Sequence, residues 1–165
     1  MIFLSASVPD PRRKNEFSGC INVNAIREAI VAFTTVCVEC NIPFYFGGHP
    51  AISPLVYSIA KNSVQDPNIK IYQSEYFKGQ TPPEVKYFKN IIWTKKNELG
   101  LQQSVEDMRT QMFSENPKTQ CIVFIGGMKG IIDEAKMLKN DFPNALFIPL
   151  ASTGGATYDL YNQCT

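Results

Sequence analysis

Short apolar segments that end in small or polar residues recur along the chain, and stretches with helical periodicity lie between them. Six of these segments are expected to be strands: residues 2–7, 43–46, 69–73, 91–94, 121–125 and 145–150. Most carry little charge, which is typical of strands that helices cover on both faces. The alternation predicts an α/β fold, a Rossmann-like doubly wound and mainly parallel sheet with helices on both faces.

Four stretches have the spacing of apolar residues that an amphipathic helix requires. The clearest one begins at Asn22 or Asn24, either of which can cap it, and ends near Asn41. The others follow Gly47-Gly48, cover about residues 101–113, and cover residues 129–139, while residues 155–160 resemble the start of one more helix. A chain of 165 residues is long enough for one domain. We therefore expect residues 1–165 to form a single domain, which either acts in trans or belongs to a larger effector.

The charge balance argues against nucleic acid and membranes as partners. The 16 basic and 15 acidic side chains leave a net charge of +1, so no broad electrostatic field attracts a polyanion. No apolar run has the length of a membrane span or a signal peptide, and the five cysteines are an odd number. Cys37-x-x-Cys40 lacks a second pair at zinc spacing, so no metal site is expected. We expect a reducing, cytoplasmic location.

Several predicted strands end alike, in small and glycine-rich turns. These ends are Ser5-Ala6-Ser7, Gly47-Gly48-His49-Pro50, Gly126-Gly127-Met128-Lys129-Gly130 and Ala151-Ser152-Thr153-Gly154-Gly155. All of them would emerge at the carboxyl edge of a parallel sheet, where open α/β folds bind ligands. Glycine admits a phosphate or ribose close to the backbone, and the following helix offers free N–H groups. The pattern predicts a pyrophosphate-containing ligand, although the fingerprints of dinucleotide dehydrogenases and P-loop enzymes are absent.

Five side chains near this edge are candidates for direct contact with a ligand, each with a simpler alternative. His49, the only histidine, would donate a neutral N–H to a phosphate or ribose oxygen, or would merely fill its turn. Asp133 and Glu134 would accept from ribose, act as a general base or nucleophile, or be solvated. Arg12 and Phe77 lie on the long connections 8–22 and 74–90. Arg12 would close over phosphates and Phe77 would stack on a base, unless both loops are decoration.

Residues 2–9, 46–56, 124–130 and 149–156 together resemble the SLOG superfamily, which joins the Smf/DprA proteins to the cytokinin-activating LOG enzymes. The likeness is to the prokaryotic branch related to the TRPM channel ligand-binding region. The resemblance implies a Rossmann-like domain that binds nucleotides or nucleotide sugars. Relatives in Thoeris antiviral systems sense cyclic ADP-ribose isomers that TIR-domain proteins make from NAD, and TRPM relatives include ADP-ribose binders. By position, the implied ligand-binding residues are Ser5, Ser7, Gly47, Gly48, His49, Gly126, Gly127, Met128, Ser152, Thr153 and Gly154.

The resemblance leaves three functions open. We expect a sensor domain for an ADP-ribose or cyclic ADP-ribose type of signal, with no tightly bound cofactor and with a TIR-domain protein or another effector as partner. LOG enzymes carry P-G-G-x-G-T-x-x-E, whereas residues 125–134 here lack its proline and threonine, which argues against catalysis. A nucleotide N-glycosidase that uses Glu134 or Asp133 is the first alternative. A homo-oligomeric scaffold with a vestigial pocket is the second.

Overall fold

A six-stranded sheet forms the centre of the structure, and every neighbouring pair of its strands is parallel. The computed structural model describes residues 1–9, 17, 20–63 and 68–164, so the candidate Arg12 lies outside the described residues. The strands are β1 (Ile2–Ser7), β2 (Phe44–Gly47), β3 (Ile69–Ser74), β4 (Asn90–Thr94), β5 (Cys121–Gly126) and β6 (Leu146–Pro149). They lie in the order β4-β3-β2-β1-β5-β6, and each matches a predicted strand to within one residue at either end.

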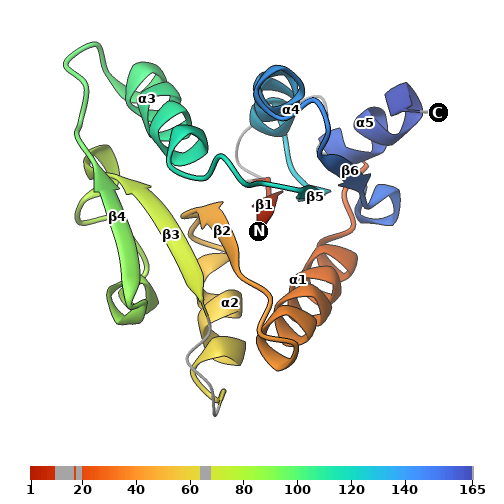
Figure 1. The fold of residues 1–165 in the computed structure, drawn as a ribbon, viewed down its shortest axis with the longest axis horizontal. Coiled ribbons are helices and arrows are strands. Elements are labelled where there is room, and N and C mark those ends of the chain that lie inside the picture. Colours follow the sequence, from red (N-terminus) through yellow and green to blue (C-terminus); the bar gives the residue numbers. More distant parts are fainter. Residues whose placement is uncertain (10–16, 18–19, 64–67, 165) are drawn as a thin grey trace.

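Helices cover both faces of the sheet, as Figure 1 shows. In the described part of the chain they are α1 (Val23–Glu39), α2 (Ser53–Ala60), α3 (Leu101–Ser114), α4 (Lys129–Asp141) and α5 (Ala156–Cys164). The pair α1 and α2 packs on one face, and α3, α4 and α5 pack on the other. The predicted cap of α1 is confirmed, because the Asn22 side chain accepts the N–H of Ala25 at 3.0 Å. The predicted α/β, Rossmann-like class is confirmed as well.

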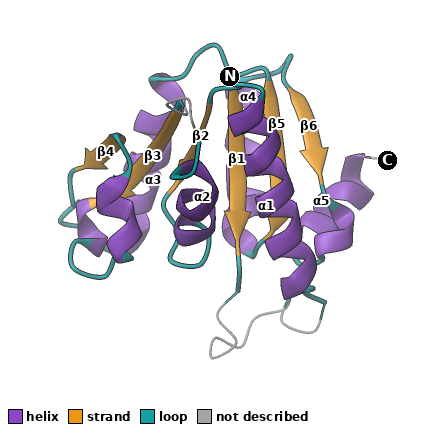
Figure 2. Cartoon of the chain, turned by 90° about the horizontal axis from the view of Figure 1, so that it is seen from below, coloured by secondary structure: helices purple, strands orange, loops and turns teal. Residues whose placement is uncertain are grey.

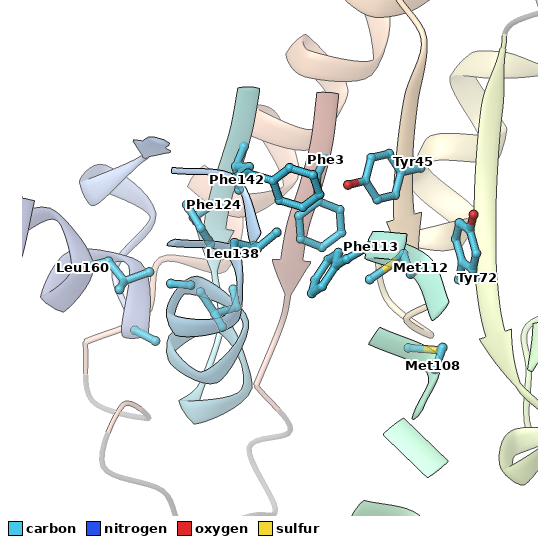
Figure 3. Packing of buried hydrophobic residues seen from close by; sticks show 14 of the residues in the cluster. Phe3, Tyr45, Tyr72, Met108, Met112, Phe113, Phe124, Leu138, Phe142 and Leu160 are labelled. Atoms are coloured by element: carbon cyan, nitrogen blue, oxygen red, sulfur yellow. The ribbon is translucent and has the colours of Figure 1, made fainter. Parts of the chain in front are cut away.

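Alternation along the strands divides the apolar side chains into two layers. The α3–α5 layer holds Phe3, Tyr45, Tyr72, Met112, Phe124 and Leu138, and Figure 3 shows it from close by. The α1–α2 layer holds Leu4, Ile26, Phe46, Val56, Ile71 and Ile125. Phe3 is almost fully buried and lies edge-on against Phe113, with ring centroids 5.2 Å apart. Burying a side chain of this size stabilises the folded state by about 2 kcal/mol. The contact between the two rings packs α3 against the middle of the sheet.

The strand order reverses between β1 and β5, which are neighbours in the sheet. From β1 the chain proceeds through α1 to β2 on one side, whereas from β5 it proceeds through α4 to β6 on the other. Figure 2 shows the carboxyl ends of the parallel strands at one common edge. The two connections therefore diverge at the ends of β1 and β5, where open α/β sheets bind their ligands.

The cysteines contribute to packing and to the end of a helix. Cys37 is buried in the α1–α2 layer, and burial raises the pKa of its thiol to about 11. Cys40 occupies the C-terminal cap of α1, which agrees with the predicted end of this helix near Asn41. The described residues contain no group of three or more cysteine, histidine or acidic side chains able to hold a metal ion. None of the helices described has the length and apolar character needed to cross a bilayer.

Candidate functional site

A hydrogen-bonded carboxylate marks the point where the strand order reverses. The Ser5 hydroxyl on β1 donates to Oε2 of Glu134 on α4 at 2.5 Å, and Arg109 Nε on α3 donates to Oε1 at 2.9 Å. Arg109 Nη2 also donates to the Gly130 carbonyl at 3.3 Å. The side chains of Arg109 and Glu134 are 14% and 16% exposed. Two helices and the central strand thus hold one carboxylate in a fixed orientation at the carboxyl edge.

The turn after β5 is locked by the protein itself. The Gly126 N–H donates to Thr153 Oγ1 at 2.8 Å, and its carbonyl accepts from Thr157 Oγ1 at 2.7 Å. The Gly127 N–H donates to the Ser7 carbonyl at 2.9 Å. Because both glycine N–H groups are already paired, they are not free to cradle a phosphate as the sequence pattern indicates.

Packing explains why these positions are glycine. Gly126 and Gly127 have positive φ angles of 65° and 85°, which disfavour any other residue. A Cβ atom at Gly126 would lie 2.4 Å from Ile26 Cδ1, and one at Gly127 would lie 2.0 Å from Ile131 Cδ1. The N–H groups that a ligand can use here belong to the first turn of α4. They precede Ile131, whose N–H donates to the Met128 carbonyl at 2.9 Å.

A second polar region lies at the ends of β2, β3 and β4. The ring atom Nδ1 of His49 accepts the backbone N–H of Ala51 at 3.2 Å. The backbone N–H of His49 donates to Ser53 Oγ at 3.1 Å. Desolvation by burial lowers the pKa of His49 from 6.5 to about 4, so the ring is neutral near pH 7 and its proton sits on Nε2. The sequence predicts a helix directly after Gly47-Gly48, which would include His49. In the structure α2 begins at Ser53, and His49 lies in the turn before it.

Gln73 and Trp93 belong to the same region, and neither is among the site residues predicted from the sequence. They are Cα partners in the β3–β4 register, and each lies two residues after an isoleucine of the α1–α2 layer. Both side chains therefore face α1 and α2. Gln73 is 5% exposed, and its Oε1 would lie 1.9 Å from a Cβ atom at Gly48. Its amide forms no hydrogen bond with any described residue.

The other predicted residues are spread along the edge. Ser152 is exposed, whereas Thr153 and Gly154 are buried, and the Thr153 hydroxyl is occupied by its bonds to Gly126 and Leu150. Phe77 is half-buried in the short 3₁₀ helix after β3 and lies edge-on against Tyr76, away from β1. The structure thus gathers Ser5, Ser7, Gly126, Gly127, Met128 and Glu134 at the reversal point. It places Gly47, Gly48, His49 and Phe77 in the region of β2 and β3.

Asp133 and Glu134 are adjacent in α4 but differ in their contacts. Both are half-buried, and only Glu134 has hydrogen-bond partners among the described residues. Arg109, its ion-pair partner, was not predicted, because the two lie 25 positions apart on different helices. The one signal in the sequence is a single cation among uncharged and acidic residues in the middle of the third predicted helix.

Comparison with known proteins finds one matching family model and a similar solved structure. The model described as the SLOG cluster3 family matches residues 16–165. The chain is also similar to the X-ray structure of TM1055, a structural genomics target, with a TM-score of 0.60 and 13% identity over 98% of this chain and 79% of the other. At this identity the likeness concerns the fold alone. No curated protein sequence matches the chain.

Proposed function

This chain belongs to the SLOG cluster3 family, and from that premise we propose that its carboxyl edge binds a nucleotide-derived signal of the ADP-ribose or cyclic ADP-ribose type. The domain then acts as a sensor that regulates an effector, with a TIR-domain protein as the source of the signal. The observation that carries the proposal is the Ser5–Glu134–Arg109 group at the reversal of strand order.

The donors and acceptors in this group suit a ribose and a phosphate. Each Glu134 oxygen accepts one hydrogen bond and keeps a further lone pair, which can accept from a ribose hydroxyl. Arg109 uses Nε and Nη2 within the protein, and its remaining guanidinium N–H groups can donate to a phosphate oxygen. The first turn of α4 adds backbone N–H groups and the positive end of its dipole. Local geometry therefore supplies anion binding to a chain with a net charge of only +1.

Calorimetric titration of the full chain with ADP-ribose, cyclic ADP-ribose isomers, NAD and AMP tests the proposal. We expect at least one of them to bind at sub-millimolar concentration and Glu134→Gln to weaken that binding. The matched control is Glu39→Gln, because Glu39 is exposed at the end of α1, near the opposite edge of the sheet. Folded protein that binds none of these compounds would overturn the proposal.

A nucleotide N-glycosidase is the second candidate, and the orientation of Glu134 is what favours it. A carboxylate held on both oxygens cannot rotate away from a bound ribose, which is what a general base or nucleophile requires. Residues 125–134 lack the proline and threonine of the LOG motif, which argues against catalysis. The sensor therefore remains the first proposal.

Chromatography after long incubation with NAD and nucleoside monophosphates separates the two functions. An enzyme releases free base, and the release disappears in Glu134→Gln but persists in Asp133→Asn. A sensor returns the compounds unchanged while still binding one of them in the titration. Release of base by wild type and Glu134→Gln alike would exclude Glu134 as the catalytic group.

A further inference from the structure

Gln73 is a largely buried residue at the carboxyl edge, and its side-chain amide has no hydrogen-bond partner among the described residues. It is 5% exposed and ends β3 together with Ser74. Leaving a buried amide unpaired is unfavourable, and native proteins rarely do so. In the described part of the chain, the side-chain polar atoms that lack both a hydrogen-bond partner and solvent access are the hydroxyls of Thr34 and Thr94. The amide atoms of Gln73 are not among them. They therefore keep some access to solvent at the edge, where a ligand can reach them.

Gly48 provides the space in which this amide lies. Any Cβ atom at position 48 would come within 1.9 Å of Gln73 Oε1, yet Gly48 has an ordinary φ angle that other residues adopt. The absence of a side chain at position 48 is thus explained by the nearby Gln73 amide and not by backbone strain. The amide lies over the end of β2, next to His49, whose Nε2–H also has no acceptor among the described residues.

Trp93 adds an apolar surface beside Gln73. It is the Cα partner of Gln73 in the neighbouring strand, faces the same side of the sheet, and is 38% exposed. A partly exposed indole next to an unpaired amide offers a stacking surface together with one donor and one acceptor. That combination recognises a planar heterocycle with hydrogen-bonding groups at its rim.

We propose that Gln73, with Trp93 beside it, recognises the adenine base of the ligand; this inference rests on the proposed function. A primary amide pairs with the N7 edge of adenine because it accepts from the exocyclic amino group and donates to the ring nitrogen N7. Hypoxanthine and guanine carry a carbonyl in place of that amino group, and the amide oxygen then meets a second acceptor. β3 lies two strands from β1, roughly 10 Å along the sheet. Gln73 faces α1 and α2, whereas the Ser5–Glu134–Arg109 group faces α3 and α4, so a nucleoside diphosphate that joins them must cross the carboxyl ends of β1 and β2 from one face of the sheet to the other.

The test compares adenine and hypoxanthine forms of the same compound. ADP-ribose and inosine diphosphate ribose are titrated calorimetrically into wild type, Gln73→Leu and the control Gln120→Leu, which changes an exposed glutamine just before β5 at the opposite edge. Wild type and the control should prefer the adenine form roughly tenfold. Gln73→Leu should lose that preference, mainly by weaker binding of the adenine form. Gln73→Met serves as a second variant, with thermal unfolding as the measure of folding.

The outcomes separate this inference from the proposed function. Equal binding of both forms by wild type, or an unchanged preference in Gln73→Leu and Gln73→Met, would overturn the assignment of Gln73 while leaving nucleotide binding in place. Failure of folded wild type to bind either form, or any compound in the earlier titration, would overturn the proposed function and this inference with it.

Discussion

Two glycine pairs end strands at the same edge of the sheet, and they resemble each other in sequence but not in structure. In Gly126-Gly127, after β5, both φ angles are positive and both N–H groups are paired within the protein. The space that a side chain would occupy is filled by Ile26 and Ile131. This pair serves the packing of α1 and α4 against the sheet.

In the pair after β2, Gly47-Gly48, neither φ angle is positive. A Cβ atom at Gly47 would meet only Met108 Cε at 3.4 Å, an ordinary contact, and one at Gly48 would meet the flexible end of Gln73. Near this pair, the Nε2–H of His49 and the side-chain amide of Gln73 have no hydrogen-bond partner among the described residues. The comparison teaches that a glycine-rich turn supports a ligand site only where its neighbours leave polar groups unpaired.

Gly127→Ala should have the largest effect on stability. The substitution combines a φ angle of 85° with a Cβ atom 2.0 Å from Ile131 Cδ1, so the free energy of unfolding should fall by about 3 kcal/mol or more. Urea unfolding measures the change. Gly47→Ala is the control and should stay within about 1 kcal/mol of wild type. Equal losses in the two variants would contradict the distinction between the two pairs.

Glu134→Gln should be next, with a loss of about 2 kcal/mol in the free energy of unfolding. The variant leaves the Arg109 guanidinium largely buried without a charged partner. Adding Arg109→Met should cost less than the sum of the two single changes, because the partners then leave together. Strict additivity in this double-mutant cycle would show that the two side chains are not coupled.

A pH titration of stability tests the second region. The folded-state pKa of His49 is about 4, below its ordinary value of 6.5, so the unfolded chain takes up the proton first as the pH falls. The stability from the neutral ring is complete above pH 6.5 and is lost as the pH approaches 4, by about 1–2 kcal/mol for a half-buried group. His49→Asn keeps an acceptor for Ala51 N–H and should remove this component of the pH dependence. An identical pH profile in that variant would show that His49 titrates normally.

Gly48→Ala should have the smallest effect on stability, under about 1 kcal/mol, because the amide end of Gln73 can rotate away. The same substitution should reduce the preference for adenine over hypoxanthine, since the amide is displaced. Calorimetric titration and urea unfolding together measure both quantities. A large loss of stability with an unchanged base preference would assign Gly48 to packing, like Gly127.

Much of the fold follows from local patterns. The uncharged apolar runs that become β1 and β5, and the capping side chain of Asn22, act over a few residues and are legible in the sequence. The first residue of α2 was harder to predict from the sequence. The His49 carbonyl accepts from both Ile52 and Ser53, so one extra turn precedes the helix without altering its apolar spacing.

The site depends on information that no local pattern contains. Arg109 meets Glu134 only because α3 and α4 share one face of the sheet, which follows from the strand order. The family resemblance implies Thr153 as a ligand-binding residue. In the structure its hydroxyl accepts the Gly126 N–H, and only the β5–β6 pairing brings these two residues near each other. Gln73 was hidden for a related reason, since a polar residue at a strand end marks a boundary as readily as a site.

The pairing of β1 with β5 joins the beginning of the chain to its last third, with Ile2 opposite Cys121. During synthesis β1 leaves the ribosome before β5, its neighbour in the sheet, which follows only after α1, α2 and α3 have been made. Ser5 and Glu134 therefore meet late in folding, after a long loop has closed. A fragment that lacks either end of the chain has no such group, and a ligand bound there stabilises the whole domain.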